Sequence, residues 1–551
     1  MFHGFDFEVQ VDRLSLTSVS SWTELDLFFF YYILQHLQND RSTLFNCLLV
    51  NRFWCKSTIP ILYTNPFLNI TEKNYTIILT IILCFNRTEI LKLKDQLGIN
   101  QIDNIDLDDE EYKPLFEYLK YLKNYNYFTI NTVIRGWSIK YNLICRNKIY
   151  DIIPIFHQSI LRQIRNIKQL DIFLHLFYYE GFQNFDVQNF TSNLTKLNSL
   201  SLNFHLKSTA HLTSDVEQEF LGNISNISLN LRKLIIKLPR TRRTNIQHTI
   251  YKNLTNNTTL RKLRTIIQKQ NKLKIFKITN CYPLFNNILL YLVSQKHSLV
   301  NIEFSNTDFS NVDLKSFNYL YNLKYLVFEN CKGIISEQCE VLNFVSFKLK
   351  KLSFKRSNWN DNVTNLMIKY LGASLQRLSV EDLKIPLMES ILMYCPNLIY
   401  LKIRIDFHFD LSVLPFFKDL RIRILSISIY SYFTNNTTIE FFINLANNIP
   451  INIKKISLYS CSSNKFLQFK GFLENCHNCF EIINLGHFID LKILRIVLNY
   501  IEKGENNLKF LGVQKFDKEL NDEELELLNQ IKDKGVKIVD FYNFCHFHNF
   551  V

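Results

Sequence analysis

One apolar frame recurs through the C-terminal two thirds of the chain. It has the form L-x-x-L-x-L, in which Ile, Val or Phe can replace Leu. Copies begin at Ile167, Leu197, Leu231, Leu273, Leu299, Leu323, Leu349, Leu375, Leu398, Ile422, Ile453, Leu491 and Leu508. The alternation in each copy predicts a short strand that buries one face.

The spacing of the copies constrains the fold further. From Leu273 to Ile422 the starts lie 26, 24, 26, 26, 23 and 24 residues apart. A period of 20–29 residues with this frame is typical of leucine-rich repeats, in which stacked units share a core that no single unit can form. Each unit has room for a helix, so we predict an α/β solenoid over residues 166–551, with a curved parallel sheet inside and helices outside.

Two intervals are longer than one repeat. Leu231 and Leu273 are 42 residues apart, and Ile453 and Leu491 are 38 apart. These intervals indicate insertions or repeats that the frame does not reveal.

Three cysteines follow the frame at one fixed position. Cys281, Cys331 and Cys461 each stand three residues after its last apolar position. A small thiol repeated where a strand ends is more readily explained by packing than by redox or metal chemistry. We interpret these cysteines as structural.

The end of the chain has the pattern of a cap. Residues 521–524, Asn-Asp-Glu-Glu, begin a predicted helix with acidic side chains at its positive end. Leu525, Leu527, Leu528 and Ile531 supply its apolar residues, Gly535 ends it, and residues 536–541 form a predicted last strand.

A compact helical segment precedes the repeats at about residues 22–66. Apolar residues recur every four positions from Leu25 to Leu37, and Asn39-Asp40 ends this first helix. A second helix covers residues 44–50, and a third begins at Phe53-Trp54 and ends before Pro60. Three short helices make a small core that a partner can complete.

This segment resembles a known domain. The stretch HLQNDRSTLFNCLLVNRFWCKSTIPILYTNPF is similar to the F-box, especially that of fungal F-box/leucine-rich-repeat proteins, whose repeats also carry the cysteine described above. The resemblance implies a Skp-type adaptor as partner, a cullin–RING ubiquitin ligase joined through it, and a protein substrate held by the repeats. The implied adaptor-binding residues are Leu27, Phe28, Ile33, Leu34, Leu37, Leu48, Val50, Trp54 and Pro60.

The start of the segment departs from the family pattern. Asp26-Leu27 stand where the family has Leu-Pro, within LDLFFFYYIL at residues 25–34. Three interpretations of the aromatic run Phe28–Tyr32 remain open: the adaptor covers it, it packs on neighbouring helices, or this F-box is degenerate.

The rest of the N-terminal part is simpler. We assign residues 1–21 to a tail and 67–165 to a helical connector. The connector contains an acidic run, IDNIDLDDEEY at 102–112, which is typical of a solvated loop.

A substrate-binding surface follows from the strand pattern. Residues between the frame positions should face the concave side of the solenoid, where the set is rich in cations with two tyrosine anchors. The predicted contacts are Tyr325, Lys351, Lys355, Arg377, Tyr400, Lys402 and Arg404. They predict a partner with an acidic segment.

The sequence gives little support for an enzymatic, metal-binding or nucleic-acid-binding function. Only 12 of 551 residues are glycine, and no phosphate loop, nucleophile elbow, kinase set or zinc-protease motif occurs. Cys476-x-x-Cys479 and Cys545-His546-x-His548 are 66 residues apart, too far to meet in a repeat array, so we expect no metal or cofactor. A net charge of +14 does not demand nucleic acid.

The location of the protein is predicted from what the chain lacks. Its first residues do not resemble a secretory signal, and its longest apolar runs are short of the roughly 20 residues that cross a membrane. The 12 scattered cysteines suit reduced thiols. We therefore expect a cytoplasmic or nuclear protein.

Together these features predict a non-enzymatic substrate-recognition subunit of a cullin–RING ligase. The alternative is a leucine-rich-repeat interaction scaffold whose F-box no longer binds an adaptor.

Overall fold

The computed structural model describes residues 32–68, 75–97, 114–141, 149–205, 215–227, 230–239, 257–281, 285–406, 410–430, 435–461, 465–503, 507–514 and 520–541. The chain forms two compact units. Unit 1 comprises residues 1–197 and 214–220, and unit 2 comprises residues 198–213 and 221–551. The division runs through helix α9 (Asp215–Asn226).

Unit 1 is mainly helical. Residues 32–36 are helical and lead into the 3-10 turn η1 (Leu37–Asn39). There follow α2 (Arg41–Leu48), α3 (Arg52–Leu62), α4 (Thr76–Ile82), α5 (Arg87–Leu97), η4 (Tyr118–Tyr121), β1 (Asn124–Asn126), α6 (Tyr127–Lys140), α7 (Ile149–Gln163), β2 (Gln169–Phe173), η5 (Leu174–Tyr178), η6 (Glu180–Phe182) and α8 (Val187–Ser192).

The first helices begin where the sequence indicates. Asp40 caps α2 by accepting a hydrogen bond from the Thr43 amide at 3.1 Å, and Asn51 caps α3 by accepting from the Trp54 amide at 3.0 Å. Both are preferred N-cap residues because a short side-chain oxygen reaches an amide that has no partner within the helix. The predicted break at Asn39-Asp40 is confirmed. Helices α2 and α3 begin at residues 41 and 52, within three residues of the predicted starts at 44 and 53.

The predicted end of the third helix is wrong. Helix α3 continues to Leu62 with Pro60 inside it. Proline removes the bond to the carbonyl four residues earlier, which here belongs to the exposed residue Lys56 and can be hydrated. The same arrangement recurs in α7, where the carbonyl four residues before Pro154 belongs to the exposed residue Tyr150. A proline near a water-facing turn therefore does not end either helix.

The connector is less uniform than predicted. Residues 67–165 contain helices α4 to α7, but also strand β1, which pairs in parallel with β2. The acidic run at 102–112 lies outside the described residues. The short strand was missed because Asn124-Tyr125-Asn126 has no apolar alternation.

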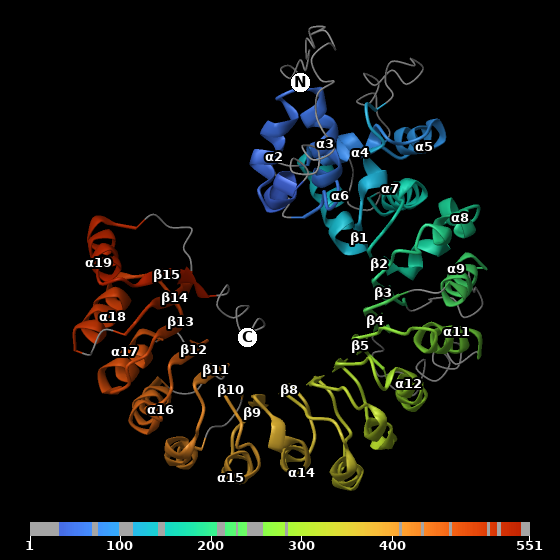
Figure 1. Ribbon diagram of the computed structural model, residues 1–551. Helices are drawn as coiled ribbons and strands as arrows, with labels where there is room; N and C mark the ends of the chain where they lie inside the picture. The colour runs from blue at the N-terminus through green and yellow to red at the C-terminus, as the bar shows by residue number, and fades with distance from the viewer. Residues whose placement is uncertain are drawn as a thin grey trace. The chain divides into compact units, whose positions relative to one another are not determined.

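Unit 2 is a leucine-rich-repeat solenoid, as predicted. Strands β3 to β15 pair in parallel and in chain order, they line the inner face, and the helices stand outside (Figure 1). Parallel strands need such covered crossovers. The strands are β3 (Ser199–Asn203), β4 (Lys233–Lys237), β5 (Ile275–Thr279), β6 (Asn301–Ser305), β7 (Tyr325–Glu329), β8 (Lys351–Lys355), β9 (Arg377–Glu381), β10 (Tyr400–Ile405), β11 (Ile424–Ile429), β12 (Lys455–Ser460), β13 (Ile482–Phe488), β14 (Phe510–Gln514) and β15 (Lys537–Asp540).

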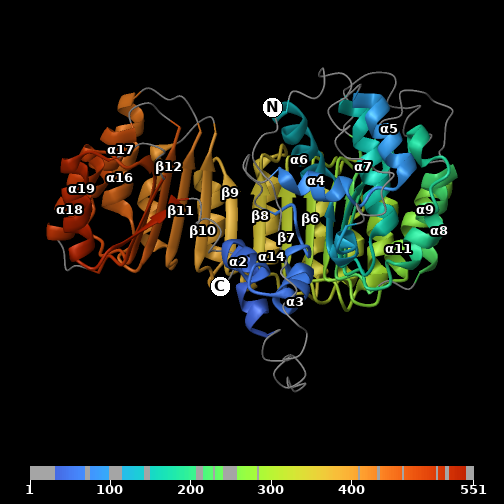
Figure 2. The same cartoon turned by 90° about the horizontal axis from the view of Figure 1, so that it is seen from above.

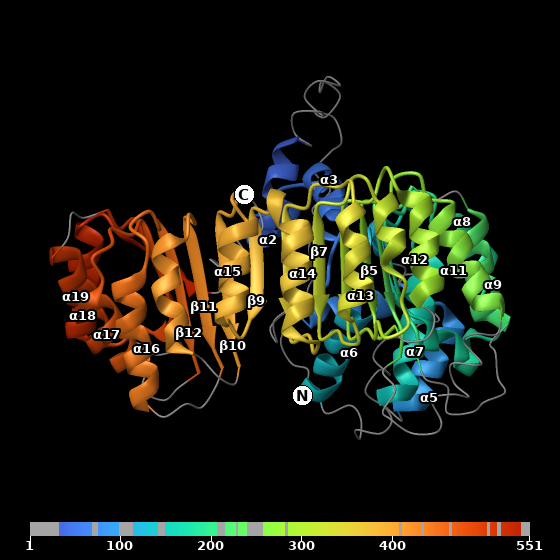
Figure 3. The same ribbon diagram turned by 90° about the horizontal axis from the view of Figure 1, so that it is seen from below.

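The helices of unit 2 form an outer row. Figure 3 shows α13 to α16 side by side on the outside, and Figure 2 shows the strands next to one another. After α9 come α11 (Asn257–Gln268), α12 (Phe285–Leu292), η7 (Val293–Gln295), η8 (Leu314–Tyr319), α13 (Ser336–Cys339), η9 (Glu340–Phe344), α14 (Asp361–Leu371), η10 (Gly372–Ser374), α15 (Ile385–Tyr394), η11 (Leu411–Asp419), α16 (Asn435–Asn448), α17 (Lys465–Asn475), α18 (Leu491–Lys503) and α19 (Asp522–Asp533).

One predicted repeat strand is a helix. The stretch from Leu491 matches the frame, but it forms α18, which buries Ile493, Leu494, Val497 and Ile501. The frame L-x-x-L also satisfies the three-to-four-residue helical period, so the two structures compete. The strand of this repeat is β13, whose frame positions are Phe480, Ile483 and Leu485. It was missed because all the recognised copies begin with Leu or Ile.

A left-handed residue follows five consecutive strands. Asn280, Asn306, Asn330, Arg356 and Asp382 come directly after β5 to β9 and have φ between 40° and 61°. Asn and Asp tolerate this conformation better than other residues with a Cβ. Arg356 is the exception in the series.

The C-terminal cap matches the sequence prediction. Asn521 caps α19 and forms a capping box with Glu524. Gly535 has a φ of 86° beyond the helix, where a left-handed residue favours glycine, and β15 pairs with β14. Among the predicted apolar residues, Leu528 and Ile531 are buried, whereas Leu525 is exposed.

Candidate functional site

One candidate surface lies on the helices of residues 32–62 in unit 1. Their core consists of Leu34, Leu44, Cys47 and Leu62, with Leu37, Leu48, Phe53, Trp54, Ile61 and Tyr63 packed against it. This core is small, which leaves several large apolar side chains outside it.

Arg41 fixes the exit of this segment. Its guanidinium donates hydrogen bonds to the carbonyls of Leu62, Asn65, Pro66 and Leu68, at 3.4, 3.0, 3.2 and 2.9 Å. A cation at the C-terminal end of α3 also complements the helix dipole. Arg41 on α2 therefore holds the end of α3 and the turn that follows it.

Apolar side chains are exposed on the same helices. Phe45 and Leu49, four residues apart on one face of α2 and its end, expose 59% and 79% of their surface. Ile33 and Val50 expose 55% and 58%. Several large exposed apolar side chains on about 20 residues indicate a surface that a partner covers.

The structure separates the predicted adaptor-binding residues into groups. Ile33 and Val50 are exposed and available. Leu37, Leu48, Trp54 and Pro60 are half-buried. Leu34 is fully buried, so its prediction as a contact residue is corrected: it belongs to the core. Leu27 and Phe28 lie outside the described residues. Phe45 and Leu49 were missed, although their spacing on α2 could have indicated them.

The second surface lies on the inner face of unit 2. Pairing between β7, β8, β9 and β10 aligns Tyr325, Lys351, Arg377 and Tyr400 in one row, which we call the entry row. A second row contains Val327, Ser353, Ser379 and Lys402. The members of the entry row are half-buried, whereas Val327 is buried and supplies no contact surface. The predicted residues of the entry row are thus brought together.

Lys351 stands among other cations. Burial lowers the pKa of its ammonium, and Lys355, Arg377 and Lys277 lower it further, against the opposite effect of Glu303. Glu303 in turn forms an ion pair with Lys277. Like charges disfavour the charged form, so Lys355 and Arg377 add to the main effect of burial on this pKa.

Arg404 does not contribute to this positive charge, which corrects the prediction. Its Nε donates to both carboxylate oxygens of Asp406 at 2.8 and 2.9 Å and lies 3.6 Å from Glu381. Its guanidinium also lies over the Tyr430 ring, 4.0 Å from the ring centroid. Glu381 lies in register with Arg404 at the end of β9, and Asp406 follows β10, so the sequence pattern of cations alone did not show these partners.

Two serines were missed in the second row. Ser353 and Ser379 face each other across β8 and β9, directly beside the Lys351–Arg377 pair. Both are buried, and Ser353 Oγ has no hydrogen-bond partner among the described residues. A serine between the frame positions is neither apolar nor charged, so the sequence does not single it out. The pairing of β8 with β9 shows that these two serines are neighbours.

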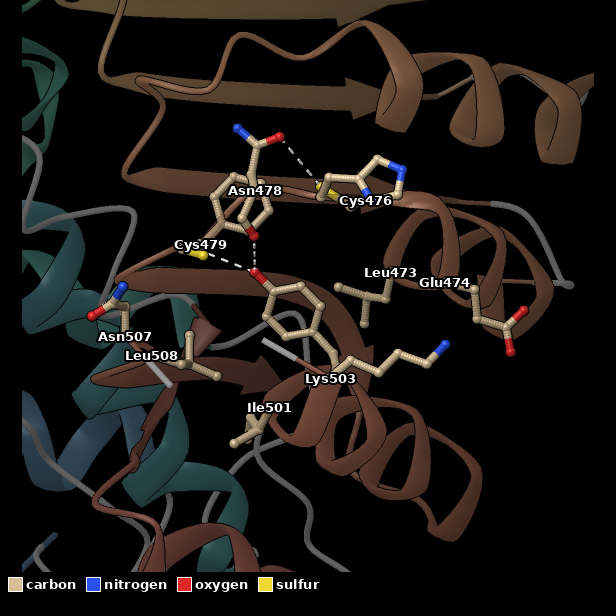
Figure 4. Close-up of a pocket in the computed structure, with 12 residues that line it drawn as sticks. Leu473, Glu474, Cys476, Asn478, Cys479, Ile501, Lys503, Asn507 and Leu508 are labelled. Atoms are coloured by element: carbon tan, nitrogen blue, oxygen red, sulfur yellow. Dashed lines mark hydrogen bonds between the residues drawn. The ribbon is translucent and has the colours of Figure 1, made fainter. Parts of the chain in front are cut away.

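The C-x-x-C segment lines a cavity of about 320 Å³ near the ends of α17 and α18 (Figure 4). The Tyr500 hydroxyl donates to the Asn478 carbonyl and accepts from the Phe480 amide, which holds the loop. Burial raises the pKa of the Cys476 thiol to about 11, with a further contribution from Cys479. A protonated thiol is a poor metal ligand or nucleophile. Among the residues that the structure describes, no group of His, Cys, Asp and Glu is arranged to hold a metal.

The repeat cysteines are part of the packing, as predicted. Cys281 and Cys331 are buried, and Cys461 is half-buried. Burial raises the pKa of the Cys331 thiol to about 12, and its Sγ lies 3.4 Å from the Phe304 carbonyl. The environments of Cys281 and Cys331 favour the neutral thiol.

No protein-family model matches the chain, and no curated protein matches it in sequence. Among solved structures, the chain is similar to the yeast Rad7–Elc1 complex, at 15% identity over 83% of this chain and 98% of that chain, with a TM-score of 0.36. It is also similar to the leucine-rich-repeat ectodomain of the Arabidopsis thaliana receptor kinase GASSHO1/SCHENGEN3 in complex with CASPARIAN STRIP INTEGRITY FACTOR 2, at 14% identity over 69% of this chain, with a TM-score of 0.24. The chain spans 42% of that ectodomain. At these TM-scores, what those proteins bind does not extend to this chain.

Membrane insertion is a separate question. Within the described ranges, no helix is both long and apolar enough to cross a membrane.

Proposed function

We propose that the protein is a substrate-recognition subunit of a cullin–RING ubiquitin ligase. The helices of residues 32–62 dock on a Skp-type adaptor, and the inner face of unit 2 holds a protein substrate with an acidic segment. The protein catalyses no step itself. It holds the substrate near a ubiquitin-conjugating enzyme, which raises the rate by proximity.

One observation carries the proposal. Among the described residues 32–66 of the segment that resembles an F-box, the core cluster contains four buried side chains, and Ile33, Phe45, Leu49 and Val50 are exposed. Exposed apolar residues of this size on so small a core favour a partner that buries them. The cations of the entry row support the second half of the proposal, because they complement an acidic segment.

The rival is an interaction scaffold with a degenerate F-box. The observation in its favour is Asp26-Leu27, where the resemblance expects Leu-Pro. In this case unit 2 still binds a protein, but the helices of unit 1 bind no adaptor.

The test is co-expression of the full chain with a Skp-type adaptor, followed by affinity capture. Val50→Asp places a charge on the exposed surface and should abolish stoichiometric capture, while Trp54→Ala should reduce it by loosening the core. Ile139→Asp is the matched control, because Ile139 is an exposed aliphatic residue on α6, away from the F-box-like helices in sequence. Absence of capture by the folded native chain would refute the ligase role and leave the scaffold.

A further inference from the structure

The entry row has a spacing that an extended peptide can match. Adjacent strands of a sheet lie about 4.8 Å apart, so Tyr325 and Tyr400, three strands apart, are separated by about 14 Å. Lys351 and Arg377 occupy the two positions between them. The row therefore presents two cations between two aromatic rings.

In an extended peptide that crosses these strands, the spacing of side chains on one face nearly matches the spacing of the entry row. An extended chain rises about 3.3 Å per residue, and side chains i, i+2 and i+4 share one face. Residues i and i+4 are then about 13 Å apart. If residue i faces Tyr325 and residue i+4 faces Tyr400, residue i+2 falls between Lys351 and Arg377.

The chemistry between the two cations suits an anion. Lys355 and Arg377 place positive charge beside Lys351, whereas Lys277 and Glu303 neutralise each other in an ion pair. An anion between Lys351 and Arg377 would relieve this repulsion and gain charge-assisted hydrogen bonds.

A buried serine pair lies beside this position. Ser353 is 1% exposed, and its Oγ has no hydrogen-bond partner among the described residues. A buried hydroxyl without a partner costs free energy. Ser353 and Ser379 stand two residues further along β8 and β9 than Lys351 and Arg377, so this pair flanks the anion position on the same face of the sheet.

We propose that β7 to β10 bind an extended segment in which one anionic side chain has a large apolar side chain two residues before it and another two residues after it. The apolar side chains pack on Tyr325 and Tyr400, and the anion binds between Lys351 and Arg377. This inference rests on the proposed function, because it specifies the segment of the substrate that the inner face holds.

A single anion fits better than a polyanion such as a nucleic acid. Glu303 and Glu329 stand on the strands before Lys351, and Glu381 ends the strand of Arg377. A continuous phosphate backbone would meet these carboxylates, whereas one anionic side chain reaches the cations between them.

The test measures fluorescence anisotropy of labelled peptides with the full chain. The first peptide carries LSESL between Gly-Ser linkers, and the second replaces Glu with phosphoserine. The third, LESSL, has the same composition but moves the acid by one position, to the opposite face of an extended chain. We expect LSESL to bind about tenfold more tightly than LESSL.

Variants identify the position. Lys351→Ala should weaken binding of LSESL about tenfold, and Lys351→Glu should bind a lysine-centred peptide, LSKSL, better than LSESL. Lys233→Ala is the matched control, because Lys233 is half-buried at the equivalent position of β4. It should leave binding unchanged. Thermal unfolding of each variant checks that unit 2 remains folded.

The outcomes separate the possibilities. Equal binding of LSESL and LESSL, equal loss in Lys233→Ala and Lys351→Ala, or displacement of the peptide by an equal concentration of 20-nucleotide single-stranded RNA would each overturn the inference. Tighter binding of the phosphoserine peptide would assign the site to phosphorylated segments, and equal binding to acidic ones. Peptide binding without adaptor capture would refute the ligase role alone, and capture without peptide binding would refute this inference alone.

Discussion

A buried histidine in unit 1 makes the stability of the fold depend on pH. The Tyr125 hydroxyl and His157 Nδ1 are 2.7 Å apart, and His157 Nε2 lies 2.7 Å from Asn131 Oδ1. Because an amide oxygen only accepts, Nε2 carries the proton and Nδ1 accepts from the tyrosine hydroxyl. His157 is fully buried, and this network holds it in its neutral form.

The sign of the effect follows from the pKa. Burial lowers the pKa of His157 from 6.5 to about 3 in the folded protein. Below pH 6.5 the unfolded chain binds a proton that the folded chain does not, so the free energy of unfolding falls as the solution becomes more acidic. Between pH 7.5 and pH 5.0 this difference amounts to about 2 kcal/mol for one group with this shift.

The assay compares the native chain with His157→Gln. Glutamine offers a donor and an acceptor but does not titrate, so the variant should lose less stability on acidification, by about 2 kcal/mol. Hydrogen exchange read by mass spectrometry over residues 124–163, corrected for intrinsic rates, localises the change to unit 1. His36→Gln, at an exposed histidine of the same unit, is the control. An identical pH dependence in the native chain and His157→Gln would refute the reasoning.

Three further predictions concern local contacts. Arg356→Asn should raise the free energy of unfolding of unit 2 by about 0.5–1 kcal/mol, because φ is 52° at this position and Asn tolerates a positive φ better than Arg. Urea titration measures the change, and an unchanged free energy of unfolding would contradict the prediction. Arg41→Ala should lower the stability of the helices of residues 32–62 by about 2 kcal/mol, because the carbonyls that follow α3 lose their hydrogen-bond donor. Proteolysis after residue 62 should become faster, whereas the control Arg52→Ala, at an exposed arginine, should leave its rate unchanged. Glu89→Ala should cost unit 1 about 1–2 kcal/mol, because it removes the 2.9 Å pair with the partly exposed Arg162 and the hydrogen bond that Glu89 accepts from the Asn86 amide. An unchanged urea midpoint would count against a structural role.

The repeat architecture could be predicted because its determinant is local. Each L-x-x-L-x-L frame specifies a strand, and the constant spacing makes neighbouring units stack in one register. The same frame is ambiguous where it coincides with the helical period, which explains the error at Leu491 and the missed strand that follows Phe480. Local pattern alone does not distinguish these cases.

The candidate site was predictable only in part, for a different reason. The strand pattern identifies Lys351, Arg377 and Arg404 as inner-face cations, but not which charges are neutralised. Asp406, which neutralises Arg404, follows its strand and falls outside the frame. Frame positions therefore identify which residues lie on the inner face of the solenoid. The net charge of that face also depends on residues in turns, which vary between repeats.

The two proposed surfaces can be tested independently because they belong to different compact units. Val50 lies in unit 1 and Lys351 in unit 2, and each unit has its own core. Substitutions in separate compact units that share no contact partner should have additive effects on stability. A Val50→Asp, Lys351→Ala double variant should therefore lose adaptor capture and peptide binding by the same factors as the single variants. Loss of peptide binding in Val50→Asp alone would mean that the two surfaces are coupled, and the substrate site would then have to include part of unit 1.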